Sequence, residues 1–234
     1  MLSVVPYVLN TWAHLTSKPV TGGWMNTPKG GRNCPSGLEY LTTIDEVLIH
    51  QKVEMLEVRT GFESINKFMM KNGQGQLIYY AIEDSNWLTR KCCGRNRAFD
   101  MNIMDKHKNH VIHFSRPNAC DSCCFPYCLQ SIAVSAPPGN IIGTVHQEWS
   151  IFRPWFTIRN PVGICGDVQF RVLSADRKHR IGVISKQWSG TKREIFMDAD
   201  YFQITFPMNL DVKMKATMMG ACILIDAMYF ESTD

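Results

Sequence analysis

The sequence predicts a mainly β protein in which a barrel of short strands encloses a hydrophobic C-terminal helix. Three observations predict this fold. Short runs of alternating apolar and polar residues recur at roughly ten-residue spacing, which is typical of sandwiches and barrels. Two of these runs form a faint repeat, in which Cys93-Gly94 precedes residues 99–103 and Cys165-Gly166 precedes residues 168–172. The chain then ends in an almost wholly apolar run over residues 216–230, which fits the interior of a closed barrel.

The apolar run at the end is predicted to be a buried helix over about residues 212–230. Fifteen helical residues span only about 22 Å, whereas the hydrocarbon core of a bilayer is about 30 Å thick. Asp226 lies within the run and would add a few kcal/mol to the cost of a membrane span. A helix that is apolar on all sides is instead typical of a protein core.

The remaining elements follow in order along the chain. Residues 1–33 show no stable period and are predicted to be a poorly ordered leader, with one barrel domain over residues 34–234. Ser36 and Glu39 have the spacing of a capping box and predict a short helical turn. A strand-like pattern begins near Val47, and Asn72-Gly73 predicts a hairpin between residues 62–71 and 76–83. Further strands are predicted at 99–103, 111–114, 130–135, 141–149, 156–159, 168–173 and 181–188.

The charge is unevenly distributed, although the net charge is only +4. Residues 90–116 contain seven Lys and Arg against two Asp, and residues 194–234 contain seven acids against two Lys. Such a distribution is consistent with solvated strand edges, or with attraction to anionic lipid or nucleic acid. The residues that we predict to contact anionic lipid are Arg90, Lys91, Arg95 and Arg97.

No catalytic motif is present. The chain lacks G-x-S-x-G, G-x-G-x-x-G and G-x-x-x-x-G-K-[ST]. His107, His110 and His113 are spaced around a predicted hairpin and would not converge on one metal ion. We therefore expect no bond chemistry and no small-molecule substrate.

The chain contains nine cysteines, and an odd number cannot all pair in intramolecular disulfides. Its first segment also lacks the features of a signal peptide, so we expect no disulfide scaffold. Four of the cysteines form a dense cluster, Cys120, Cys123, Cys124 and Cys128. From the residues alone, three interpretations stay open: a zinc site, S-acylation beside aromatic and basic residues, or small buried apolar side chains. Several acyl chains would anchor a protein stably, whereas one gives only marginal binding.

The best candidate for a cation site is the acidic stretch before the final helix, because oxygen ligands suit Ca²⁺. Compared with an EF-hand loop the match is poor, since Gln203 stands at the glycine position and Asn209 at the bidentate glutamate position. The alternative is a solvated strand end. The candidate ligands are Asp198, Asp200, Gln203, Thr205, Asn209 and Asp211.

Several motifs occur together in the order found in the phospholipid scramblases, and from residue 34 onward the chain resembles that family. These motifs are CPSGLEYL at 34–41, CCG at 92–94, the cysteine cluster, APPG at 136–139, ISKQW at 184–188, DAD at 198–200, FP at 206–207, DVKMK at 211–215, GACILID at 220–226 and FES at 230–232.

The resemblance implies a tubby-like β-barrel around the hydrophobic helix, and Ca²⁺-stimulated, ATP-independent, bidirectional movement of phospholipids between leaflets. It also implies S-acylation at the cysteine cluster, Ca²⁺ binding over residues 198–209, and a location at the cytoplasmic face of the plasma membrane. The expected partner is an anionic phospholipid membrane, with nucleic acid and a nuclear location as alternatives for a chain that is not acylated.

The chain departs from the family pattern at several points. Asn209 replaces the usual Asp, the import-signal region at 182–188 lacks one Lys and has Gln187 in place of His, and the region at 160–165 is shorter. The proline-rich N-terminal tail of the family is absent, so we expect no WW or SH3 partners. The competing functions are a lipid- or DNA-binding adaptor without transport, and a zinc-stabilised structural module.

Overall fold

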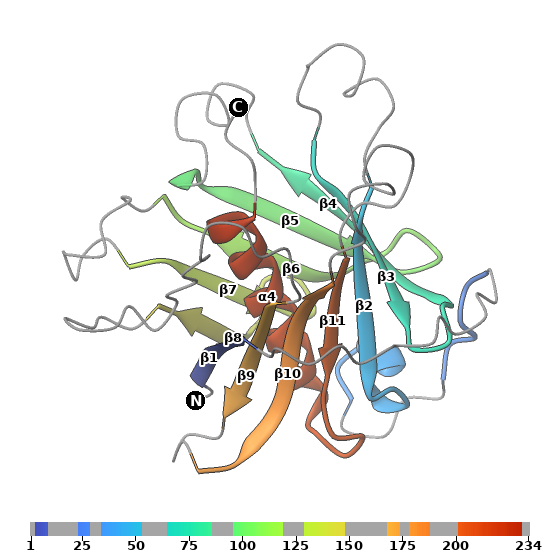
Figure 1. Ribbon diagram of the computed structural model, residues 1–234. Helices are drawn as coiled ribbons and strands as arrows, with labels where there is room; N and C mark the ends of the chain where they lie inside the picture. Colours follow the sequence, from blue (N-terminus) through green and yellow to red (C-terminus); the bar gives the residue numbers. More distant parts are fainter. Residues whose placement is uncertain are drawn as a thin grey trace, which may run out of the picture.

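The structure, a computed structural model, describes residues 3–8, 23–28, 34–52, 65–85, 96–118, 129–147, 168–173, 178–187 and 201–230. It is mainly β, with one antiparallel sheet and a C-terminal helix (Figure 1). The elements are β1 Ser3–Val8, the 3-10 turn η1 Glu39–Thr42, β2 Glu46–Gln51, β3 Lys67–Asn72, β4 Leu77–Asp84, β5 Phe99–Met104, β6 His110–Arg116, β7 Ser131–Ser135, β8 Ile141–His146, β9 Val168–Leu173, β10 Arg180–Gln187, β11 Tyr201–Thr205 and α4 Val212–Tyr229.

The sheet has eleven strands in the order β1-β9-β10-β11-β2-β3-β4-β5-β6-β7-β8. Strands from β2 to β8 pair with their neighbours in sequence, and β11 joins this series to β10, β9 and β1. Within the described residues no pairing connects β1 with β8. The predicted mainly β class is therefore confirmed, whereas the closure of the sheet into a barrel is not.

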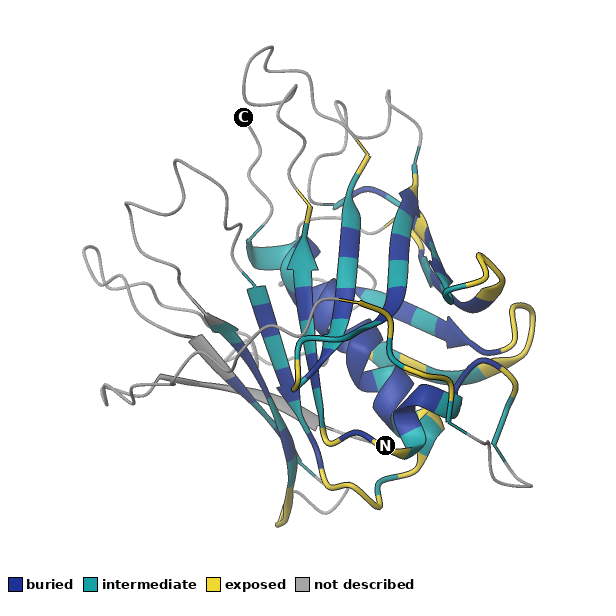
Figure 2. Cartoon of the chain, turned by 90° about the vertical axis from the view of Figure 1, so that its right-hand side faces the viewer, coloured by how far each residue is buried: buried dark blue, intermediate teal, exposed yellow. Residues whose placement is uncertain are grey.

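Alternation of buried and less buried residues along several strands separates the two faces of the sheet. In β5, Phe99, Met101 and Ile103 are buried while Asp100 is exposed, as the period of two in the sequence predicts. The same alternation occurs in β3 and β11. Figure 2 shows this banding of buried and less buried residues along the strands. One apolar face is thus produced by several strands that are distant in sequence.

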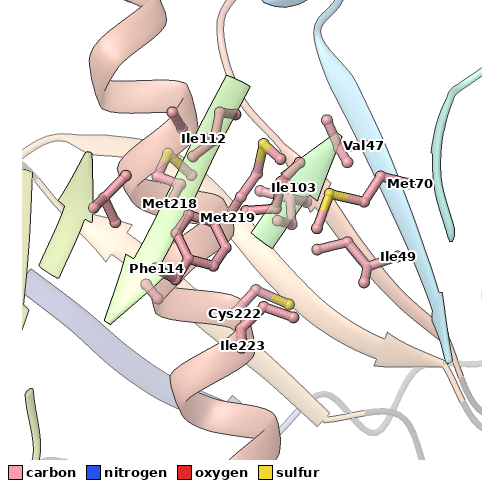
Figure 3. Packing of buried hydrophobic residues seen from close by; sticks show 14 of the residues in the cluster. Val47, Ile49, Met70, Ile103, Ile112, Phe114, Met218, Met219, Cys222 and Ile223 are labelled. Carbon is pink, nitrogen blue, oxygen red and sulfur yellow. The ribbon is translucent and has the colours of Figure 1, made fainter. Parts of the chain in front are cut away.

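Helix α4 covers that apolar face. It contacts η1, β6, β7, β8 and β11, and its side chains Met218, Met219, Cys222 and Ile223 lie among residues of the sheet (Figure 3). Asp211 caps its first turn, with the carboxylate accepting a 2.8 Å hydrogen bond from the Lys213 amide. The predicted buried helix over about 212–230 is therefore observed as α4. Among the described helices, none is long and apolar enough to cross a bilayer.

The approach between α4 and the sheet is close at two glycines. A Cβ atom added to Gly143 of β8 would lie 2.2 Å from Oγ1 of Thr217, and one added to Gly220 would lie 2.6 Å from Cγ2 of Val134. Glycine at these positions lets the helix backbone pack directly on β7 and β8.

The hairpin predicted at Asn72-Gly73 is confirmed between β3 and β4. The Asn72 side-chain oxygen accepts hydrogen bonds from the amides of Gln74 at 3.0 Å and Gln76 at 2.9 Å. Gly75 has a φ of 82°, which favours glycine. Local turn chemistry therefore determines this connection.

Two predictions for the first forty residues are wrong in part. The segment 1–33 is not wholly a poorly ordered leader, because Ser3–Val8 pairs with β9 and Met25 donates to the Leu77 carbonyl at 2.9 Å. The predicted helical turn exists as η1, but the Ser36–Glu39 capping box does not form. Glu39 instead accepts a 2.8 Å hydrogen bond from the Gly37 amide.

Candidate functional site

One end of the sheet, which we call the loop end, carries the segments that contain most of the candidate residues. At this end β4 and β10 finish, at Asp84 and Gln187, and β5 and β11 begin, at Phe99 and Tyr201. The antiparallel register brings these strand ends together with those of β2, β3, β6, β7, β8 and β9. The links 85–98, 117–130 and 188–200 therefore all leave and re-enter the sheet at one end.

These three links contain Arg90, Lys91, Arg95, the cysteines Cys120, Cys123, Cys124 and Cys128, and Asp198 and Asp200, all of which lie outside the described residues. The structure therefore places the strand ends on either side of these three links, and not the candidate residues within them.

Arg97 has a different role from the one predicted. Its guanidinium donates to both carboxylate oxygens of Glu83, each at 2.9 Å, and the two side chains are only 3% and 1% exposed. Its charge is therefore balanced inside the protein. Because of this burial, Arg97 is excluded from the exposed lipid-binding patch for which it was predicted.

Arg116 forms a second buried contact at the loop end. Its Nε and Nη2 donate to the Gln130 side-chain oxygen at 3.2 and 2.7 Å. Both guanidinium groups approach the same ring, since Arg97 lies 5.7 Å and Arg116 5.5 Å from the centroid of Phe99. The Glu83–Arg97 and Arg116–Gln130 contacts thus form one buried group of charged, polar and aromatic side chains.

The described Ca²⁺ candidates lie along β11 and beyond its far end, while Asp198 and Asp200 lie outside the described residues. β11 is an extended five-residue strand between β10 and β2, so Tyr201 and Thr205 lie about 13 Å apart at about 3.3 Å per residue. Ca²⁺–oxygen distances are only about 2.3–2.6 Å. Asn209 and Asp211 therefore lie far from the start of β11 on the scale of one coordination sphere.

The described Ca²⁺ candidates also have other partners. The Gln203 amide donates to the Glu46 carboxylate, and Asp211 caps α4. Asn209 is exposed, and Thr205 is half-buried at the end of β11. In the described part of the chain, no three His, Cys, Asp or Glu side chains are placed to hold a metal ion.

Lys215 is a buried cation that the sequence reasoning missed. Its side chain has no exposed surface, and its ammonium donates to the carbonyl oxygens of Leu41, Ile44 and Met208, each at 2.8 Å. The ammonium also lies 4.9 Å from the centroid of Phe206. Burial lowers the pKa of Lys215, while the charge of Asp45 acts in the opposite direction. The sequence feature that could have predicted this burial is the position of Lys215 next to the apolar run of the final helix.

The two described cysteines differ from the predicted acylation cluster. Cys222 is buried in α4, and this burial raises the pKa of its thiol well above the usual value. Cys34 is half-buried, and desolvation raises its pKa as well. Both shifts disfavour the thiolate, which is the reactive form.

The segment that resembles an import signal lies largely inside the sheet. Residues 182–187 belong to β10, which pairs with β9 on one side and β11 on the other. Ile184 and Ser185 are buried, and the Lys186 ammonium lies 4.0 Å from the centroid of Phe230. In this fold the segment is therefore not an exposed linear peptide. The shortened region at 160–165 lies outside the described residues.

Taken together, these features define a mainly β domain in which one apolar helix packs against an antiparallel sheet. The sequence profile of the family described as Scramblase matches residues 25–232, so the chain belongs to the scramblase family.

Curated relatives agree with this assignment. The chain is 50% identical over 224 residues to phospholipid scramblase 1 of Rattus norvegicus, covering 90% of this chain and 67% of the relative. It is 49% identical over 238 residues to phospholipid scramblase 2 of Bos taurus, covering 92% and 81%. It is 44% identical over 211 residues to phospholipid scramblase family member 5 of Homo sapiens, covering 84% and 78%. No solved structure matches the chain.

Proposed function

We propose that this protein accelerates the bidirectional, ATP-independent movement of phospholipids between bilayer leaflets, with Ca²⁺ as a stimulator. The observation that carries the proposal is the identity of about half of all residues to proteins named phospholipid scramblases, over nine-tenths of the chain. The proposed activity moves lipid and makes or breaks no covalent bond.

We propose that the loop end is the part of the protein that contacts lipid. The packing of α4 against the sheet supports this, because a helix whose apolar side chains are buried in the protein exposes little apolar surface for contact with a bilayer. The proposed membrane contacts are acyl chains on Cys120, Cys123, Cys124 and Cys128, with Arg90, Lys91 and Arg95 attracted to anionic headgroups. We propose that the protein acts at the cytoplasmic face of the plasma membrane.

For Ca²⁺ stimulation, we propose that Asp198 and Asp200 supply the protein ligands, with headgroup phosphates completing the weak site. Their link leaves the sheet at the same end as the basic and cysteine-containing links. The proposed site does not include Asn209 and Asp211, because they follow β11 whereas Asp198 and Asp200 precede it in the chain.

Reconstituted vesicles test the transport proposal. Purified acylated protein is incorporated into phosphatidylcholine–phosphatidylserine vesicles that carry a fluorescent phospholipid, and a membrane-impermeant quencher reports lipid that reaches the outer leaflet. We expect faster exchange than in protein-free vesicles, with further acceleration by Ca²⁺. Exchange no faster than in protein-free vesicles, with and without Ca²⁺, would refute the transport proposal.

Two matched double variants test the cation proposal in the same assay. Asp198→Asn/Asp200→Asn should abolish Ca²⁺ stimulation while leaving the basal rate, and Asn209→Ala/Asp211→Asn should keep the stimulation. Asn at 211 preserves an oxygen acceptor for the helix cap. Loss of stimulation in the second variant alone would contradict the assignment.

The alternative is an adaptor that binds lipid or DNA without transport. The enclosed position of α4 favours it, because the apolar side chains of this helix are buried against the sheet. Binding to liposomes and to DNA across a salt series discriminates these functions, since phosphate contacts weaken steeply with salt. Salt-sensitive binding without lipid exchange would support the adaptor.

A further inference from the structure

The end of the sheet opposite the loop end, which we call the turn end, exposes large apolar side chains. It carries the turns β3–β4, β5–β6 and β7–β8 and the start of α4 (Figure 2). Among the described residues, the exposed large apolar side chains are Ile141 at 66%, Met208 at 51%, Ile65 at 41% and Trp24 at 39%. Trp24 pairs with Leu77 at the start of β4, so all of these except Ile65 belong to the turn end. Exposed apolar groups thus gather at one end of the sheet.

The start of α4 brings the two most exposed of these side chains close to a lysine. Ile141 begins β8, and Gly143 of the same strand packs directly on Thr217 of α4. The Thr217 hydroxyl donates to the Lys213 carbonyl at 2.8 Å, one helical turn nearer the start of α4. Met208 lies in the exposed turn that leads into the helix. Ile141, Lys213 and Met208 therefore surround the first turns of α4.

Two further strand ends reach the same part of the surface. A Cβ atom added to Gly182 of β10 would lie 2.8 Å from Cε of Met218, the residue after Thr217, so Arg180 at the start of β10 is also near the start of α4. β6 pairs with β7, so the turn β5–β6, which carries Lys108, lies two strand spacings, or about 10 Å, from the turn β7–β8. The turn end is therefore one continuous surface.

Exposed basic residues surround the apolar side chains of the turn end. They are Lys108, Arg180 and Lys213, each on a different element or turn. Two acids of the same segments are instead directed at the backbone, since Asp105 and Asp211 each accept a hydrogen bond from a main-chain amide at 2.8 Å. Ile141 and Met208 thus project from a surface on which positive side chains are exposed.

We propose that the turn end is a docking surface for an anionic phospholipid bilayer. Ile141 and Met208 enter the headgroup region, while Lys108, Arg180 and Lys213 bind lipid phosphates. Single apolar side chains on separate turns suit a soft lipid surface, whereas the core of a protein–protein interface is a continuous, closely packed apolar patch. The turn end lies across the sheet from the loop end. The inference therefore does not rest on the proposed function, and a chain held at both ends faces two bilayers.

Three variants of the full chain, purified without acyl chains, separate the two parts of this surface from the rest of the protein. The charge variant removes the exposed basic residues: Lys108→Gln/Arg180→Gln/Lys213→Gln. The apolar variant removes the exposed apolar residues: Ile141→Ser/Met208→Ser. The matched control makes the same kinds of change at the loop end: Lys52→Gln/Ile65→Ser. All of these residues are exposed, so each variant should keep the Tm of the wild type within a few degrees.

Cosedimentation with phosphatidylcholine–phosphatidylserine vesicles measures the binding of each variant. We expect the charge variant to bind roughly a hundredfold more weakly at low salt and to lose much of the salt dependence. The apolar variant should bind roughly tenfold more weakly with the salt dependence of the wild type. The loop-end control should bind as the wild type does. Wild-type binding by both turn-end variants, or an equal loss in the control, would overturn the inference.

Two further outcomes distinguish this inference from its alternatives. Salt-sensitive binding of the wild type to DNA, lost in the charge variant and without binding to vesicles, would identify a nucleic-acid surface and overturn the lipid assignment. Vesicle binding that the turn-end variants lose, in a protein that does not accelerate lipid exchange, would support the docking surface and refute the proposed function. Lipid exchange by a wild type whose vesicle binding depends on none of these five residues would do the reverse.

Discussion

Replacing Lys215 by methionine should destabilise the fold substantially, although the two side chains have similar lengths. The substitution leaves three backbone oxygens, those of Leu41, Ile44 and Met208, without the ammonium that they share. At about 1–3 kcal/mol for each unsatisfied buried acceptor, the two buried contacts, to Leu41 and Ile44, correspond to about 2–6 kcal/mol, and the contact to Met208 is only partly buried. This loss is offset by several kcal/mol, because methionine incurs no cost of burying an ammonium.

We therefore expect the free energy of unfolding to fall by about 3 kcal/mol, near the lower limit for breaking a buried charged contact. For a chain of this size, that corresponds to a decrease of roughly 6–12 °C in Tm. Calorimetry and urea unfolding of purified protein measure the change. Lys213→Met is the matched control, because Lys213 is exposed on the same helix and its replacement should cost less than about 0.5 kcal/mol.

The stability lost on removing the Lys215 side chain should be partly restored by a small cation. Lys215→Ala leaves room for a small cation, so ethylammonium should raise the Tm of this variant more than that of the wild type. A Lys215→Met protein as stable as Lys213→Met would show that the three carbonyl contacts contribute no net stability. Equal responses of Lys215→Ala and wild type to ethylammonium would refute the cation site.

Three other measurements test neighbouring features of the fold. Because the folded-state pKa of Lys215 lies below its ordinary value of 10.5, the unfolded chain binds more protons between the two values. The free energy of unfolding should therefore rise with pH across that window, and urea titrations at alkaline pH should show a smaller rise for Lys215→Met. Gly143→Ala should cost about 1–3 kcal/mol through its clash with Thr217, and adding Thr217→Ala should recover part of that loss in a double-mutant cycle. Asp211→Ala should cost about 1 kcal/mol by thermal unfolding, whereas Asp211→Asn should cost less, since asparagine still caps α4.

Local patterns predicted the parts of the fold that depend on neighbouring residues. The period of two at Phe99, Met101 and Ile103, the Asn72-Gly73 turn and the apolar run of α4 all have direct structural counterparts. Each is determined by interactions within a few residues or by burial of one face. A sequence pattern records both of these directly.

Contacts between distant residues were not predictable from such patterns. β1 pairs with β9, so Ser3 lies opposite Leu173, and Pro6 within β1 weakens its strand signal. The buried contacts of Arg97 with Glu83 and of Arg116 with Gln130 were also missed, because buried arginines are indistinguishable in sequence from exposed ones. The separation of the Ca²⁺ candidates, by contrast, was foreseeable: Tyr201, Gln203 and Thr205 alternate with Phe202 and Ile204, which is a strand pattern and not a loop pattern.

The position of α4 after all of the strands that the structure describes has a consequence for biosynthesis. The apolar face of the sheet is translated before the helix that covers it, so the emerging strands have no complete core until residues 212–229 have left the ribosome. The pairing of β1 with β9 also waits for most of the chain, and such long-range contacts slow folding. Nascent chains that stall before α4 should therefore expose aggregation-prone surface and depend on chaperones.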